Sequence, residues 1–215
     1  MTRSRAGNYE DKKQVILDRA SEIIARKGFE GATMIEVANA CGTSKSHLYH
    51  YFSSKEDLLF SIVSEHIAAQ VTELADIMAL PLPAVERFGR FIGAFVALSA
   101  ESRSEHQILM HDLKFLPENQ HKEVQQLEIK LVRMMSGLLR EINPELMTPS
   151  AVQAPYALMV YGMVIWSVSW YEKTGPIAPP ELAARISQLL IHGFKGARFP
   201  EPQSITARSI STTAA

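Results

Sequence analysis

The sequence contains one cysteine, Cys41, among 215 residues, so an internal disulfide is excluded. It also lacks the run of roughly 20 apolar residues that a helix needs to cross a bilayer, and its first residues, MTRSRAGNYEDKK, lack the apolar stretch of a signal peptide. We therefore expect a soluble protein in a reducing cytoplasm with no membrane partner. In that setting Cys41 is expected to be a small buried side chain rather than a reactive thiol.

Motifs of catalytic and metal sites are also missing. The chain has no Gly-rich phosphate loop, no nucleophile motif and no CxxC pair. The groups that come closest are His47 with His50, and His106 with His111 and Asp112. Neither group has further ligands at a fixed local spacing, which a zinc or acid–base site needs. We expect no enzyme activity, no metal site and no cofactor.

The net charge is only −1, from 22 Lys and Arg against 23 Asp and Glu, but the charges are unevenly distributed. Residues 1–55 hold nine basic and six acidic side chains, which leaves 13 basic and 17 acidic for the rest. The first quarter is therefore modestly basic, which favours contact with phosphates there. A broadly non-specific polyelectrolyte binder is excluded, because it would need many more cations.

Helical periodicity runs through most of the chain, and we find no strand pattern and no internal repeat. The fold class is therefore expected to be all-α, with a small three-helix domain in residues 1–55, a larger helical domain in 56–196 and a disordered tail in 197–215. The first dozen residues have no periodicity and are expected to form a mobile arm. The predicted helices are 11–27, one beginning near Met34, 45–51, 55–80, 84–101, a shorter segment over 104–116, 118–142, 151–173 and 181–195.

Two short helices meeting at a turn stand out near the start. Thr33 and Glu36 form a capping box at the start of the first helix, Gly42 is suited to end it, and Ser44 can cap the second. The second helix has a polar outer face, which is the sequence form of a helix-turn-helix whose second helix can enter the major groove. An ordinary helical hairpin fits the same pattern. The predicted core of this domain is Ile16, Ala20, Ile23, Phe29, Val37, Ala38, Leu48 and Phe52.

The segment TMIEVANACGTSKSHLYHYFSSKEDLL, residues 33–59, resembles the DNA-binding region of the TetR (tetracycline repressor) family of bacterial transcriptional regulators. The Gly28–Phe29 pair and the order of helices on either side are also similar. The resemblance implies a homodimer with an N-terminal helix-turn-helix domain and a C-terminal ligand-binding and dimerisation domain. It implies a DNA-binding regulator, most simply a repressor that a small-molecule effector releases from a palindromic operator.

The resemblance also implies which residues contact DNA. Those expected to contact phosphates are Thr33, Tyr49 and Lys55, and those expected to face base edges or the adjacent backbone are Ser44, Lys45, Ser46 and His47, with Thr43 and His50 as further candidates. The Tyr and Thr hydroxyls and the helix N-terminus near Lys55 are donors to phosphate oxygens, and Lys45 can donate to guanine acceptors in the major groove. Thr43 and His47 depart from the family's usual residues, so the operator sequence cannot be inferred. An alternative for Tyr49 is a half-buried ring that packs on the first helix.

The runs HDLKFLPENQHKEVQQLE and WYEKTGPIAPPELA resemble a branch of these regulators that responds to acyl-CoA thioesters. An acyl-CoA or another apolar effector is therefore expected in a cavity between helices, with Arg133, His106 or Lys114 at its mouth for an anionic group. Methionines and aromatics at helical spacing equally fit a filled core. The candidate ligand-binding residues are Phe91, Phe95, His106, Met110, Leu113, Arg133, Met134, Leu138, Met159, Met163 and Trp166.

The last two helices carry more apolar residues than one buried face needs, which favours a four-helix interface across a two-fold axis. Two faces of the first of these helices are alternatives for the partner. One is Tyr156, Val160, Val164 and Val168, and the other is Met163, Trp166 and Trp170; the second helix would add Leu182, Ile186, Leu189, Leu190 and Phe194.

A helical protein-binding adaptor that keeps the domain without reading DNA is the main alternative function.

Overall fold

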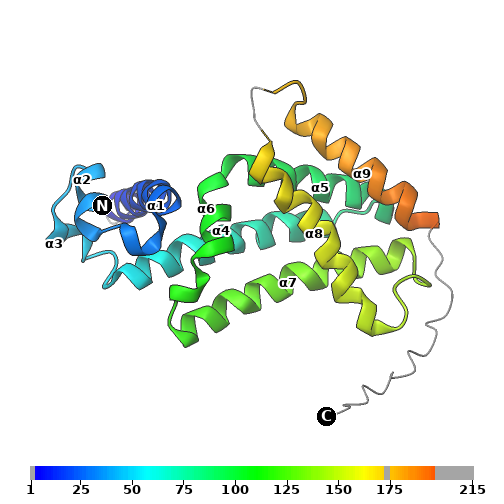
Figure 1. Ribbon diagram of the computed structural model, residues 1–215, viewed down its shortest axis with the longest axis horizontal. Coiled ribbons are helices and arrows are strands. Elements are labelled where there is room, and N and C mark those ends of the chain that lie inside the picture. The colour runs from blue at the N-terminus through cyan, green and yellow to red at the C-terminus, as the bar shows by residue number, and fades with distance from the viewer. Residues whose placement is uncertain (1–2, 172–174, 197–215) are drawn as a thin grey trace, which may run out of the picture.

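The computed structural model describes residues 3–171 and 175–196, and in this part of the chain every regular element is a helix (Figure 1). The all-α fold class is therefore confirmed. The predicted tail, 197–215, lies outside the described residues. The helices are α1 (Arg3–Gly31), α2 (Met34–Ala40), α3 (Lys45–Leu48), α4 (Lys55–Met78), α5 (Ala84–Glu101), α6 (Arg103–His111), α7 (Glu118–Ile142), α8 (Gln153–Trp170) and α9 (Pro179–Gly196), with 3-10 turns at Leu113–Phe115 and Ser150–Val152.

Helices α1, α2 and α3 form a small head at one end of the molecule, and α4 to α9 form the larger body (Figure 1). All eight residues predicted for the core of the head are buried. The apolar face of α1 and the short α2 and α3 thus enclose one core, as their sequence periodicity predicted.

The start of α1 was wrong in the sequence prediction. The helix begins at Arg3, not near Asp11, so the expected mobile arm is helical. Two contacts with distant residues fix this end. The Tyr9 ring stacks on Tyr51 with centroids 4.6 Å apart, and Lys13 Nζ donates to Glu65 at 2.6 Å. Local periodicity could not reveal the helix because these stabilising partners lie far along the chain.

Gly28 interrupts α1 with φ 75° and ψ 160°, a conformation that other residues rarely adopt. The chain turns there and places Phe29 against the body. The Phe29 ring stacks on Phe115 at 5.0 Å, and its N–H donates to the buried carboxylate of Asp112 at 3.3 Å. The segment after α6 therefore holds the turn that ends the main part of α1.

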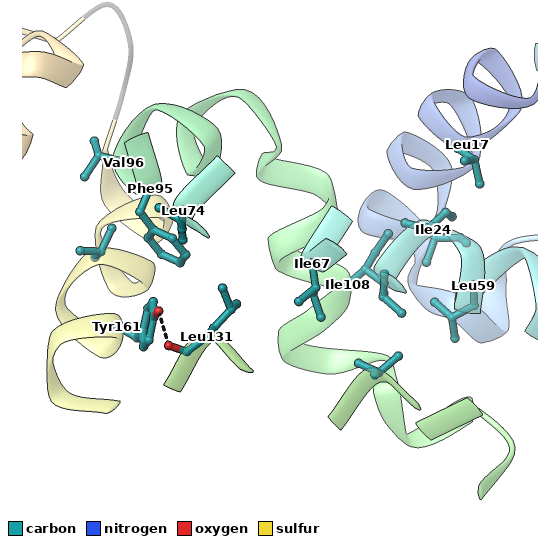
Figure 2. Close-up of a cluster of buried hydrophobic side chains, with 14 of the residues drawn as sticks. Leu17, Ile24, Leu59, Ile67, Leu74, Phe95, Val96, Ile108, Leu131 and Tyr161 are labelled. Atoms are coloured by element: carbon teal, nitrogen blue, oxygen red, sulfur yellow. Dashed lines mark hydrogen bonds between the residues drawn. The ribbon is translucent and has the colours of Figure 1, made fainter. Parts of the chain in front are cut away.

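Helix α4 leaves the head and runs through the body, where it packs against α5, α6 and α7 (Figure 1). Ser54 caps it by accepting a hydrogen bond from the Asp57 N–H at 2.9 Å. One continuous buried cluster follows this helix from Leu59, beside Ile24 of α1, to Leu74, near Phe95 of α5 (Figure 2). Head and body thus share a core, and α4 is a mechanical link between them.

Candidate functional site

The turn between α2 and α3 is built by local hydrogen bonds. Thr33 caps α2 together with Glu36, as predicted, and Gly42 has φ 62° just after that helix. Ser44 caps α3 by accepting from the His47 N–H at 3.1 Å. The regular part of α3 ends at Leu48, three residues before the predicted end, because the N–H groups of His50 and Tyr51 bond at i−3 spacing and tighten the chain into turns.

Leu48 is fully buried, so α3 is fixed to the head and turns its other side outward. Of the predicted DNA contacts, Thr43 and Lys55 are half-buried. The remaining predicted contacts are exposed: Thr33, Ser44, Lys45, Ser46, His47, Tyr49 and His50. The arrangement therefore leaves donors and aromatic rings of the head accessible, which contact with phosphates and base edges requires.

Tyr49 is 42% exposed, and Lys45 Nζ lies 5.7 Å from the centre of its ring. The exposed ring favours the predicted DNA-facing role of Tyr49 over the alternative in which it packs on the first helix. It is Tyr51 that stacks on Tyr9 of α1, and the His47 ring meets the Tyr51 ring edge-on at 5.4 Å. Lys45 and Tyr49 form an exposed cation–aromatic pair, and Tyr51 anchors the turn that follows α3.

The ammonium of Lys55 is bonded within the protein. Its Nζ donates to the carbonyl oxygens of Phe29, at 2.7 Å, and Ala32, at 3.0 Å, and lies 4.3 Å from the centre of the Phe29 ring. The ammonium thus satisfies carbonyls after the Gly28 turn. The group of Lys55 that remains suited to an anion is its backbone N–H in the first turn of α4.

Thr33 is also engaged internally, since its hydroxyl donates to a carboxylate oxygen of Glu36 at 3.0 Å. The same carboxylate pairs with Lys27 of α1. Hydrogen bonds from Lys27 and Thr33 lower the pKa of Glu36. A phosphate contact by Thr33 would therefore require its hydroxyl to rotate away from Glu36.

The body contains a cavity of about 420 Å³ between α4, α5, α6, α7 and α8. Phe95, His106 and Met110 line it, as the sequence predicted. The walls are mainly apolar, which suits an apolar small molecule. The full lining is Ile67, Gln70, Phe95, His106, Leu109, Met110, Gln125, Glu128, Ile129, Leu131, Val132, Leu158, Tyr161 and Ile165.

The other eight predicted ligand residues do not line this cavity, for three physical reasons. Phe91 and Leu138 are fully buried in the surrounding core, and Leu113 and Met134 are partly buried against it. Arg133, predicted at the mouth, is exposed elsewhere on α7, and Lys114 is also outside the lining. The last three, Met159, Met163 and Trp166, point outward from α8.

Four polar lining residues were missed by sequence reasoning: Gln70, Gln125, Glu128 and Tyr161. Gln70 carried a usable signal, because it lies on the apolar stripe of α4, one turn before Leu74 and one turn after His66. The hydroxyl of Tyr161 donates to the Leu131 carbonyl at 2.8 Å (Figure 2). Its hydrogen bond therefore closes part of the wall between α7 and α8.

A cluster of three polar side chains lies at the α4–α6 side of the cavity. The Gln70 amide nitrogen is 2.9 Å from Nε2 of His66 and 3.5 Å from Nε2 of His106, and the two imidazole rings meet edge-on at 4.9 Å. Burial lowers the pKa of His66 to about 4. Burial, together with the neighbouring His66, lowers the pKa of His106 to about 3. Both rings are therefore neutral near pH 7.

These two histidines predict an acid sensitivity of stability. Their folded pKa values lie below the ordinary value of 6.5, so the free energy of unfolding is expected to fall as pH drops from 6.5 toward 4. Above pH 6.5 both rings are neutral in the folded and the unfolded protein, and no stability is lost through them. As pH falls toward the folded pKa values, the unfolded protein binds more protons, and the free energy of unfolding falls by at most about 1.4 kcal/mol per pH unit for each ring. Urea unfolding at about pH 7, 6 and 5 measures this slope.

The His106→Phe variant should show a shallower slope, because it removes one of the two rings that take up protons on unfolding. The matched control is His192→Phe on α9, where the histidine is exposed; it should keep the wild-type slope. Equal slopes in wild type and His106→Phe would contradict the prediction.

The outer face of α8 and α9 carries large apolar side chains in contact with water. Val160 and Val164 are buried in the body, so the Met163, Trp166 and Trp170 face is the outward one of the two predicted alternatives. The side chains of Val168 and Phe194 lie outside the described residues. Apart from Leu158, which lines the cavity, the most exposed large apolar residues of these two helices are Met159, Trp166, Trp170 and Leu189, at 56–67%. A patch of this kind marks an interaction surface.

Among the residues that the structure describes, no helix combines the length and apolar character of a membrane span. In the same residues, no three His, Cys, Asp or Glu side chains gather closely enough to hold a metal ion. His106 is buried beside the cavity, whereas His111 is exposed at the end of α6. The arrangement is thus a binding cavity joined to a helix-turn-helix.

Two family models match the chain. "Bacterial regulatory proteins, tetR family" matches residues 16–62, and "Tetracyclin repressor-like, C-terminal domain" matches residues 81–194. Similar curated proteins include the HTH-type transcriptional repressor KstR2 of Mycobacterium tuberculosis, which is 22% identical over 88% of this chain and 96% of the relative. The HTH-type regulator YerO of Bacillus subtilis is 30% identical over 60% of this chain, and the match spans 45% of its own length. For another Bacillus subtilis regulator, YuxN, the match spans 23% of its length.

Solved structures show the same fold. A TetR-family transcriptional regulator from Bordetella parapertussis has a TM-score of 0.78 and 28% identity, over 87% of this chain and 98% of that one. AibR, solved in complex with isovaleryl coenzyme A and operator DNA, has a TM-score of 0.73 and 23% identity, over 84% of this chain and 98% of that one.

Proposed function

Because the chain belongs to the tetR family of bacterial regulatory proteins, we propose that it is a homodimeric transcriptional repressor that a small apolar effector releases from a palindromic operator. Residues 1–55 are the DNA-binding domain and residues 56–196 bind the effector and the second protomer. The observation that carries the proposal is the apolar cavity lined by α4 and α6, since both helices also contact the head. The protein acts in the cytoplasm, where its operator is.

In the proposed complex the exposed surface of α3 enters the major groove. Lys45, with Ser44, Ser46 and His47, faces base edges, and Tyr49 donates its hydroxyl to a phosphate. Thr33, Thr43 and His50 border this surface. Lys55 contributes its backbone N–H rather than its ammonium. A dimer places two such helices in successive major grooves, roughly 34–36 Å apart.

The outward apolar face of α8 and α9 supplies the dimer interface. Trp166, Trp170 and Leu189 are more than half exposed in the single chain, and a two-fold axis would bury them against the same residues of a second copy. Helices α8 and α9 of the two protomers would then form a four-helix bundle. Both helices belong to the body and lie apart from α2 and α3 (Figure 1), so rotation of the two bodies about this interface would change the spacing of the heads.

Effector binding controls DNA binding through α4 and α6. Ile67 and Gln70 of α4 and His106 of α6 line the cavity, and Asp112 after α6 binds the backbone of Phe29 in the head. An effector that prefers the non-DNA-binding arrangement tenfold shifts the equilibrium by about 1.4 kcal/mol. A modest preference is therefore enough for release.

Acyl-CoA thioesters are the effector class to test first, with the acyl chain in the apolar cavity and the anionic CoA part outside it. Two findings support this choice: the apolar walls of the cavity and the fold shared with AibR, whose structure contains isovaleryl coenzyme A. We expect at least one member of a chain-length series of acyl-CoAs to lower operator affinity tenfold or more in a fluorescence anisotropy assay. Free CoA is the control, and indifference to the whole series would remove this effector class.

A further inference from the structure

We propose that His66, Gln70 and His106 form the polar subsite of the effector cavity and bind one uncharged oxygen group of the effector, a carbonyl or a hydroxyl. This inference rests on the proposed function, because it takes the cavity to be the effector site. It adds the chemical class of the ligand: an apolar molecule with one uncharged oxygen placed to meet the α4–α6 wall.

The polar cluster is incompletely satisfied by the protein itself. Gln70 is only 2% exposed and His106 only 3%, and both line the cavity. The hydrogen bonds that the described residues make with Gln70 use only its amide nitrogen. Its amide oxygen is therefore left for a ligand or for water. This oxygen is not one of the sealed, partnerless atoms of the described residues, so water or a ligand can reach it from the cavity. A ligand that donates a hydrogen bond to it gains affinity.

The lining also specifies that the oxygen is uncharged. Glu128 is the one charged residue of the lining, and burial raises the pKa of its carboxyl. The two imidazoles carry no charge near pH 7, because burial holds their pKa values at about 4 and about 3. A carboxylate placed in the cavity would lose its hydration and meet no cation, which is unfavourable.

A carbonyl and a hydroxyl are both suitable because the Gln70 amide can present either of its ends. With its nitrogen toward the histidines, the free amide oxygen accepts from a ligand O–H. With the amide turned over, its oxygen accepts from Nε2–H of the histidines and its N–H donates to a ligand carbonyl. The rest of the lining, including Phe95, Leu109 and Ile129, is apolar and would contact the carbon skeleton.

The subsite spans the two helices that carry the head. His66 and Gln70 belong to α4, and His106 belongs to α6, five residues before the end of that helix at His111. An oxygen bound between them would contact both helices at once. The effector's polar group would therefore lie between α4 and α6, and a change in the distance between these helices would move the head.

Titration calorimetry of the full chain with four matched probes tests the inference. The probes are propylbenzene, phenylpropanol, benzylacetone and phenylpropanoate, which represent the apolar skeleton, the hydroxyl, the carbonyl and the carboxylate. In wild type, we expect phenylpropanoate to bind at least about tenfold more weakly than phenylpropanol, since it would bring an unpaired charge into the cavity.

The variant is Gln70→Leu, which keeps side-chain volume and removes the amide. It should weaken phenylpropanol and benzylacetone about tenfold and change propylbenzene less than twofold, the signature of one lost hydrogen bond. The matched control is Gln125→Leu, because Gln125 is an exposed glutamine of the same lining; it should change none of the probes more than twofold. If Gln70→Leu fails to fold, His106→Phe gives the same comparison while keeping an aromatic ring beside Phe95.

Three outcomes are decisive. Selective loss of the alcohol and the ketone in Gln70→Leu supports the subsite. Equal loss of propylbenzene and phenylpropanol, or wild-type binding of phenylpropanoate as tight as that of phenylpropanol, overturns the subsite and leaves the apolar cavity in place. Absence of binding by all four probes removes the cavity as an effector site. The proposed control of DNA binding by an effector in this cavity is then contradicted as well.

Discussion

Replacing Lys45 with alanine is expected to weaken operator binding about ten- to one-hundredfold and to leave the melting temperature unchanged. Lys45 is exposed in the first turn of α3, held above the Tyr49 ring, while Leu48 on the opposite side anchors the helix. Loss of one specific base contact costs roughly 1–3 kcal/mol. Both protomers carry the change, so even the lower cost of about 1 kcal/mol per half-site weakens binding of the dimer more than tenfold.

Fluorescence anisotropy at about 100 mM salt with competitor DNA measures this effect, since non-specific binding is suppressed under those conditions. Tyr49→Ala should also weaken binding, because the ring and its hydroxyl are lost together. The matched control is Lys122→Ala, an exposed lysine of α7 that pairs with Glu118, which should bind the operator as wild type does. Wild-type affinity of both Lys45→Ala and Tyr49→Ala would show that α3 is not the reading surface.

Replacing Leu189 with glutamate is expected to convert the dimer to a monomer and to lower operator affinity at least about one-hundredfold. Leu189 is 67% exposed on α9, and in the proposed interface it joins Trp166 and Trp170 of α8. Dimerisation would bury it against the partner, where an unpaired carboxylate is strongly unfavourable. The loss of affinity follows because two linked heads bind a palindrome 10²–10⁴-fold better than one head.

Sedimentation equilibrium measures the change in mass, and anisotropy measures the change in affinity. Ile35→Glu is the control for mass, because Ile35 is 53% exposed on α2 at the other end of the molecule. This variant should remain a dimer. A dimeric Leu189→Glu protein would place the interface on another face, and monomeric wild type would remove the proposed arrangement of two heads.

Sequence reasoning was most accurate where local signals set the structure. Helices α5 and α7 begin and end at the predicted residues because Pro83 and Pro117 stand directly before them and Asn143 follows α7. The capping box at Thr33 and the cap at Ser44 are likewise formed as predicted, and Ser54 caps α4. These signals act within four residues and are legible without a structure.

Sequence reasoning was less accurate where partners lie far apart in the chain. The first turns of α1 depend on Tyr51 and Glu65, and the ammonium of Lys55 is engaged by carbonyls of Phe29 and Ala32. Neither contact has a local signature. The predicted α3 was too long because the chain tightens at Tyr49, after the buried Leu48.

The cavity in the body was the least predictable feature. Helix α8 is apolar on most sides, so periodicity could not distinguish Tyr161, which lines the cavity, from Met163 and Trp166, which point outward. The polar lining residues were not predicted, because an apolar effector was expected to contact apolar side chains. Gln70, a polar residue within an apolar stripe, shows that an inconsistency in the pattern can mark a site.

The central claim is that α3 reads a palindromic operator as part of a dimer. The most direct measurement is a titration of the wild-type protein against a palindromic fragment from its own gene neighbourhood and against the same fragment with scrambled half-sites, at about 100 mM salt with competitor DNA. The account predicts saturation at one dimer per palindrome and affinity at least about one-hundredfold tighter than for the scrambled fragment. Equal affinity for the two fragments, or no binding to either, would contradict it and favour a helical protein-binding adaptor.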